Sequence, residues 1–129
     1  MEKIEICPAE RLKARVVLPA SKSISNRALL INALSQSRLA PENVSDCDDT
    51  RAMLAALRDM PETIDIGAAG TAMRFLTAYL SVTDGQHVIT GTERMRHRPI
   101  AILVNALRQL GAQIDYLGEE GFPPLCIMG

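Results

Sequence analysis

Apolar residues recur at helical spacing in four segments of the chain. The pattern is clearest after Pro99, where apolar residues repeat every three or four positions and Gly111 is placed to end the helix. The third helical segment is apolar on nearly every side, which predicts that it is buried. The predicted helices cover residues 23 to about 35, about 48 to 60, about 72 to 81, and 99 to about 110.

Short apolar or alternating stretches between these helices are typical of strands. They are residues 3–6, 14–18, 63–66, 86–90, 113–117 and 125–128. Turns around residues 8–11 and 118–124 are expected to join the first two strands and the last two strands, respectively. From residue 63 the order is β-α-β-α-β-β, and the first half reads as a shortened copy of it. The sequence therefore predicts an α/β fold in two units, about 21–60 and 61–129.

Composition excludes several classes of protein. The net charge is −1, Trp is absent, and only two Phe and two Tyr occur, so neither nucleic acid nor a membrane surface is an expected partner. The three cysteines lack metal-ligand or disulfide spacing, and no run of apolar residues is long enough to cross a membrane. We expect a cytoplasmic protein that uses no metal. Of the 14 basic residues, 3 are lysines and 11 are arginines, which suits fixed recognition of anions.

The candidate chemistry begins where the first predicted helix starts. Lys22, Ser23 and Arg27 crowd its first turns, with Arg27 four residues after Ser23 on the same face. A helix N-terminus presents unpaired N–H groups and the positive end of the helix dipole. Added cations make this junction a predicted phosphate or carboxylate site. Serines here are also common N-caps, so the neighbouring junctions decide between the two interpretations.

Two more junctions point to the same chemistry. The small-residue turn at 67–71 leads into a helix that carries Arg74, so a ligand can approach the backbone closely. Residues 94–98 place three arginines before Pro99, which predicts an anion clamp. Asp48 and Asp49, by contrast, are interpreted as N-caps aligned with the helix dipole.

Three motifs in these places resemble one family. They are residues 19–29 (Pro-Ala-Ser-Lys-Ser-Ile-Ser-Asn-Arg-Ala-Leu), 69–74 (Ala-Gly-Thr-Ala-Met-Arg) and 94–100 (Arg-Met-Arg-His-Arg-Pro-Ile). Together they resemble 5-enolpyruvylshikimate-3-phosphate synthases, the 3-phosphoshikimate 1-carboxyvinyltransferases of the shikimate pathway. The motifs occur in the family's order and the resemblance covers essentially the whole chain. It implies the enolpyruvate transferase fold, with two similar domains of repeated βαβαββ units and ligands in the cleft between them.

The resemblance also implies an activity and its site. The family transfers the enolpyruvyl group of phosphoenolpyruvate to the 5-hydroxyl of shikimate 3-phosphate and releases phosphate, on the route to chorismate and the aromatic amino acids. It needs no cofactor, and the full-length protein is expected to be a monomer. Ser23 and Arg27 would hold shikimate 3-phosphate, Lys22 both substrates, and Gly70 and Arg94 phosphoenolpyruvate. Secondary candidates that match the motifs are Thr71, Arg74 and Arg98.

The chain departs from the family pattern at two of these places. The family usually has Asn at the position of Ala68 and Pro at that of Phe75. Both lie beside the expected positions of phosphoenolpyruvate and of the inhibitor glyphosate. The segment between Met60 and Gly67 is also shorter than usual.

The resemblance also implies how the chain divides. Residues 1–20 are expected to belong to the other domain and residues 21–129 to the first part of the N-terminal-half domain.

Two alternatives remain beside the transferase. The acid and base residues are expected beyond this chain, which reads as a fragment, so the isolated chain could be a non-catalytic binder of a phosphorylated ligand. The other alternative is the UDP-N-acetylglucosamine enolpyruvyl transferase. That enzyme normally has Lys-Asn in place of Lys22-Ser23 and a reactive Cys within 91–98, and this chain has neither.

Overall fold

The computed structural model describes residues 3–8 and 11–129, which contain five helices and four strands. In chain order these elements are α1 (Lys22–Leu34), α2 (Asp48–Asp59), β1 (Thr63–Asp65), α3 (Gly70–Leu80), β2 (Gln86–Thr90), α4 (Glu93–Arg96), α5 (Ala101–Gln109), β3 (Gln113–Tyr116) and β4 (Leu125–Met128). From β1 onward the order matches the predicted β-α-β-α-β-β unit, with α4 added. The predicted α/β class is confirmed.

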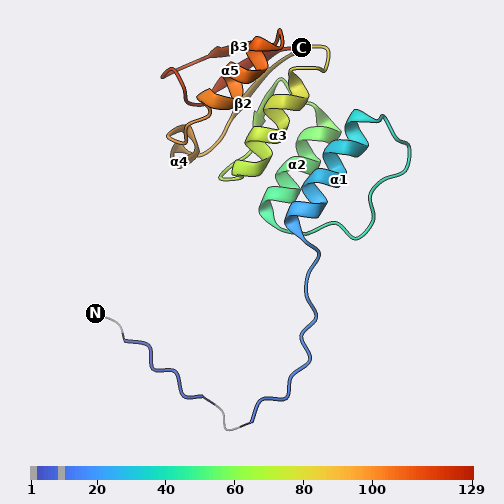
Figure 1. Ribbon diagram of the computed structural model, residues 1–129, viewed down its shortest axis with the longest axis vertical. Coiled ribbons are helices and arrows are strands. Elements are labelled where there is room, and N and C mark those ends of the chain that lie inside the picture. The colour runs from blue at the N-terminus through green and yellow to red at the C-terminus, as the bar shows by residue number, and fades with distance from the viewer. Residues whose placement is uncertain (1–2, 9–10) are drawn as a thin grey trace.

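The four strands form one mixed sheet with the order β1-β2-β4-β3. β1 runs parallel to β2, as the crossover through α3 requires, and β4 is antiparallel to both of its neighbours. α3 contacts β2 and β4, while α5 contacts β3. On its other side α3 contacts α1 and α2, so the three helices lie side by side and α3 connects them to the sheet (Figure 1).

The core lies on both sides of α3, which confirms the prediction of a buried helix. Its apolar side chains at Ala72, Met73, Leu76 and Leu80 are at most 1% exposed. They face Ile89, Leu125 and Ile127 of the sheet, which are fully buried. Because burial of apolar surface is the main favourable term in folding, α3 is the element that fixes the rest of the fold in place.

The strands predicted at residues 3–6 and 14–18 are wrong. These residues are extended but pair with no strand among those described, and Ile4, Ile6, Val17 and Leu18 are 80–89% exposed. A strand needs a neighbour that accepts and donates backbone hydrogen bonds, and none of the sheet's strands lies beside this segment. Figure 1 shows the chain before α1 extending away from the helices and the sheet. Part of the turn predicted at 8–11 lies outside the described residues.

Several predicted helix boundaries also need correction. The N-cap of α2 is Cys47, and Asp48 and Asp49 occupy its first turn, where they complement the helix dipole but do not cap. α3 begins at Gly70, two residues before the predicted start. The N-cap of α5 is Ile100, so Pro99 precedes the helix. α5 ends as predicted, because Gly111 follows the C-cap with a φ of +100° that favours glycine.

Part of the loop predicted at 91–98 is the short helix α4. Thr92 is its N-cap and its hydroxyl accepts a hydrogen bond from the Met95 N–H at 3.4 Å. Met95 is buried, which holds the turn against the core. A helix of four residues is too short to show apolar periodicity in the sequence. In the described part of the chain, no helix has both the length and the apolar character needed to cross a membrane.

Candidate functional site

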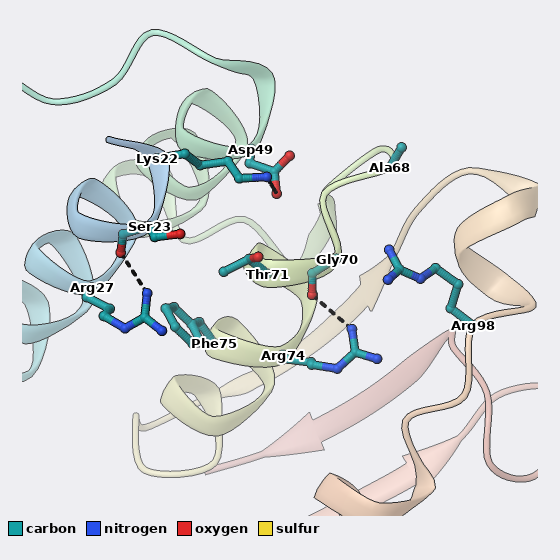
Figure 2. A pocket seen from close by; sticks show the side chains of 10 residues that line it. All are labelled: Lys22, Ser23, Arg27, Asp49, Ala68, Gly70, Thr71, Arg74, Phe75 and Arg98. Carbon is teal, nitrogen blue, oxygen red and sulfur yellow. Dashed lines mark hydrogen bonds and ion pairs between the residues drawn. The ribbon is translucent and has the colours of Figure 1, made fainter. Parts of the chain in front are cut away.

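The N-terminal ends of α1, α2 and α3 meet around one cavity of about 430 Å³. Figure 2 shows the side chains of the three helices and Arg98 around this space. The lining residues are Lys22, Ser23, Arg27, Asp49, Ala68, Gly70, Thr71, Arg74, Phe75 and Arg98. Since the first N–H groups of each helix have no acceptor within the helix, the cavity combines polar donors with the positive ends of helix dipoles.

α1 turns a polar face toward the cavity and a second polar face toward α2. Ser21 caps the helix by accepting a hydrogen bond from the Ile24 N–H at 3.4 Å. On the buried face, Ser25 Oγ accepts from the Ser45 N–H at 2.8 Å, and Thr50 Oγ1 donates to Asn26 Oδ1 at 2.9 Å. These buried hydrogen bonds fix α1 against the start of α2, which places Lys22, Ser23 and Arg27 at the cavity.

The turn before α3 is shaped by the backbone. Gly67 has a φ of +58°, a conformation that favours glycine, and its N–H donates to Asp65 Oδ1 at 2.8 Å. The Thr92 N–H donates to the Gly67 carbonyl at 3.0 Å and ties the turn to the segment after β2. The turn therefore delivers Gly70 and Thr71 to the cavity at the N-terminus of α3.

Four cations and one carboxylate line the cavity, which gives the lining a net charge of +3. Lys22 Nζ lies 3.5 Å from Asp49 Oδ2. Arg74 donates to the Gly70 carbonyl at 3.2 Å and to the Pro99 carbonyl at 3.3 Å. The guanidinium of Arg98 lies against the Cα of Gly70, from the side opposite α1 (Figure 2).

This charge distribution is suited to an anion with more than one negative charge. Two unit charges of the same sign about 4 Å apart repel by about 4 kcal/mol at an effective dielectric constant near 20. Asp49 relieves only part of the repulsion, because it pairs with Lys22 alone among the described cations. A phosphate or carboxylate in the cavity would relieve the rest and receive the helix N–H groups.

Seven of the eight predicted site residues line this cavity. They are Lys22, Ser23, Arg27, Gly70, Thr71, Arg74 and Arg98. Arg94 does not: it lies exposed on α4 and is not part of the lining. Of the three arginines predicted to form a clamp at 94–98, the cavity lining therefore includes one, and the clamp stays a prediction. Arg96 donates to the Gly91 carbonyl at 3.2 Å, and only Arg98 reaches the cavity.

Asp49 lines the candidate site although no sequence pattern indicates it. The sequence pattern indicates an N-cap, yet the Asp49 side chain is 21% exposed and pairs with Lys22 at the cavity. No local sequence signal links the two, since they are joined only by the packing of α1 on α2. Nearby, hydrogen bonds with Ser45 and then Thr50 lower the pKa of the Cys47 thiol below its usual value.

Comparison with known proteins gives consistent matches along the chain. A sequence model of EPSP synthase (3-phosphoshikimate 1-carboxyvinyltransferase) matches residues 6–64 and 59–129. A 3-phosphoshikimate 1-carboxyvinyltransferase of Bacteroides fragilis is 67% identical over 119 residues, which are 92% of this chain and 29% of the relative. One from Vibrio cholerae is 43% identical over 155 aligned positions, covering 100% of this chain and 36% of the relative.

Solved structures give the same result. EPSP synthase from Acinetobacter baumannii superposes with a TM-score of 0.75 at 28% identity, over 88% of this chain and 31% of that protein. The chain thus spans about a third of the length of the relatives it matches. With the family's sequence model matching almost every residue and the fold shared with a solved member, the chain belongs to the EPSP synthase (3-phosphoshikimate 1-carboxyvinyltransferase) family.

Proposed function

We propose that this chain supplies part of the site at which the enolpyruvyl group of phosphoenolpyruvate is transferred to the 5-hydroxyl of shikimate 3-phosphate, with release of phosphate. The observation that carries the proposal is the cavity where three helix N-termini meet four cations. Both substrates are multiply charged anions, and each bears a phosphate that such a cavity is suited to bind.

The positions of the lining residues support a division of roles. Ser23 and Arg27 stand on the α1 side of the cavity and would hold shikimate 3-phosphate. Gly70 stands on the other side and would offer its backbone to phosphoenolpyruvate, with Lys22 between the two substrates. Arg94 is the third expected ligand of phosphoenolpyruvate, beside Lys22 and Gly70. Because it is outside the lining, we place Arg98, which adjoins Gly70, ahead of it.

In this reaction a proton is added to the methylene carbon of phosphoenolpyruvate, which makes its C2 electrophilic. The 5-hydroxyl then attacks C2 and loses its proton, and the tetrahedral ketal that forms loses phosphate together with a proton from its methyl group, which restores the double bond. The lining cations would neutralise the phosphate and carboxylate charges and orient the two substrates. Asp49 is the one carboxylate of the lining and is paired with Lys22. We therefore propose that the residues that move protons lie outside this chain, as do the cations of a second domain.

The wider assignments follow the family. We propose that residues 1–20 contribute to the other domain, that residues 21–129 form the first part of the N-terminal-half domain, and that the full-length protein is a cytoplasmic monomer. The exposed apolar side chains before α1 support the first of these assignments, because a second domain would cover them.

Calorimetry and a turnover assay on the 129-residue chain test the proposed function together. Titration with shikimate 3-phosphate is expected to give saturable heat, because α1 provides the proposed phosphate site. With both substrates present, no phosphate release above the blank is expected, because proton transfer needs groups outside the chain. Absence of binding would contradict the proposed site. Measurable phosphate release would contradict the proposal that this chain supplies only part of the active site.

The same titration with UDP-N-acetylglucosamine distinguishes the proposed function from that of the alternative transferase, which uses this sugar nucleotide. The relatives described above are named 3-phosphoshikimate 1-carboxyvinyltransferases, which favours shikimate 3-phosphate as the ligand. We expect no saturable heat with the sugar nucleotide. Tighter binding of that compound than of shikimate 3-phosphate would reverse the assignment.

Replacing Gly70 with alanine tests the phosphoenolpyruvate side of the cavity. The added Cβ would lie 3.0 Å from Arg98 Cζ, so the guanidinium must move away from the N-terminus of α3. The side-chain end is flexible, and we expect the free energy of unfolding to change by less than about 1 kcal/mol. Phosphoenolpyruvate binding, measured by calorimetry, is expected to weaken at least about 5-fold, since one charge-assisted hydrogen bond is misplaced.

Gly118→Ala is the matched control. A Cβ there would lie 3.9 Å from Pro124 Cδ, an ordinary contact, and Gly118 is outside the cavity lining. Equal phosphoenolpyruvate affinity in the Gly70→Ala and Gly118→Ala chains would contradict the role given to the Arg98 guanidinium beside Gly70.

A further inference from the structure

Arg27 is held at the cavity by neutral groups. Its Nη1 donates to the Ser23 carbonyl at 2.9 Å, and its Cζ lies 5.7 Å from the centroid of the Phe75 ring. The ion pairs found in the described part of the chain join Lys22 to Asp49 and Arg58 to Asp59, and neither includes Arg27. The charge of Arg27 is therefore not neutralised by a neighbouring carboxylate.

Two of the other lining cations have further polar partners. Lys22 has Asp49 as a partner at 3.5 Å, and Arg74 donates to two backbone carbonyls. In Figure 2 the guanidinium of Arg27 lies next to the ring of Phe75, and both residues border the same side of the cavity. A ring face attracts a cation through its quadrupole but leaves the N–H groups at the guanidinium edge free to bind another group.

Phe75 is well placed to act on Arg27 for a structural reason. It lies four residues after Thr71 on α3, so both side chains are on the face that lines the cavity. The next residue, Leu76, is fully buried and anchors this turn of α3 in the core. The contact between α3 and α1 then sets the separation of ring and guanidinium.

We propose that Phe75 is a positioning residue, whose ring holds the Arg27 guanidinium at the cavity wall without neutralising it, so that Arg27 meets the phosphate of the ligand with its full charge. This inference rests on the proposed function for the identity of the ligand.

NMR on the 129-residue chain tests the proposal, with inorganic phosphate as the probe. In the free chain, the ring current of Phe75 is expected to shift the Arg27 side-chain protons upfield. Phe75→Leu should abolish the shift, and Phe75→Tyr, which keeps the ring face, should retain it. Phosphate affinity should fall about 2- to 5-fold in Phe75→Leu and return to the original value in Phe75→Tyr.

Two further variants separate positioning from a general loss of packing. Tyr79→Leu removes an aromatic ring one turn later on α3, outside the cavity, and should leave phosphate affinity unchanged. In an Arg27→Gln background, Phe75→Leu should change phosphate affinity by less than about 1.5-fold, because the residue acts through Arg27.

The outcomes distinguish this proposal from the proposed function. Unshifted Arg27 protons in the free chain, or equal phosphate affinity in Phe75→Leu and the unmodified chain, would overturn the role of Phe75 and leave the proposed site standing. Failure of both phosphate and shikimate 3-phosphate to bind the unmodified chain would overturn both.

Discussion

Replacing Arg27 with glutamine is expected to weaken the binding of shikimate 3-phosphate about 10- to 100-fold, because hydrogen bonds to a charged group contribute about 1.5–3 kcal/mol. Glutamine keeps a polar side chain but removes the charge and the fork of N–H groups that fits a phosphate. Arg27 is exposed at the surface of α1, so its loss costs the folded chain little. Isothermal titration calorimetry, with circular dichroism to confirm folding, measures the effect.

Arg58→Gln provides the matched control for this variant. Arg58 has a side chain that is 77% exposed and pairs with Asp59 at 2.7 Å, at the opposite end of α2 from the cavity. The Arg58→Gln variant removes one positive charge, as Arg27→Gln does, so it reproduces any long-range electrostatic contribution to binding. The affinity should match that of the unmodified chain. Equal losses in the two variants would show that Arg27 acts only through net charge.

Replacing Leu76 with alanine is expected to lower the free energy of unfolding by about 2–5 kcal/mol. Leu76 is fully buried on α3, where this helix joins the sheet to α1 and α2. Removing its side chain leaves a cavity at that junction, and the tightly packed surroundings can collapse only in part. Urea denaturation followed by circular dichroism measures the change as a lower midpoint.

Leu110→Ala is the matched substitution on the surface. Leu110 is 86% exposed at the C-cap of α5, and its truncation should change the free energy of unfolding by no more than about 0.5 kcal/mol. A loss at Leu76 as small as that at Leu110 would show that α3 is not the element that holds the layers together.

Local patterns in the sequence predicted the parts of the fold that depend on local interactions. The buried helix α3 and the end of α5 at Gly111 follow from apolar spacing and backbone preference, and the structure confirms both. The strands predicted at 3–6 and 14–18 were wrong because strand formation depends on a partner elsewhere. Apolar residues with strand-like spacing do not reveal whether that partner is present.

The site shows the same division. Lys22, Ser23 and Arg27 could be predicted because all three lie in the first two turns of one helix, and the cavity includes all three. Arg94 and Arg98 are also four residues apart, but α4 ends at Arg96, so the two arginines do not share a helix face. Asp49 reaches Lys22 only through the packing of α1 against α2. Contacts of this kind arise from tertiary structure and leave no local pattern.

The central claim is that the cavity at the N-termini of α1 and α3 binds the phosphorylated substrate. The most direct measurement is an NMR titration of the ¹⁵N-labelled 129-residue chain with shikimate 3-phosphate. We expect saturable shift changes that are largest at the backbone amides of Lys22, Ser23 and Thr71 and at the side chain of Arg27. Saturable changes confined to residues away from these helix ends, or no saturable change at all, would contradict the claim.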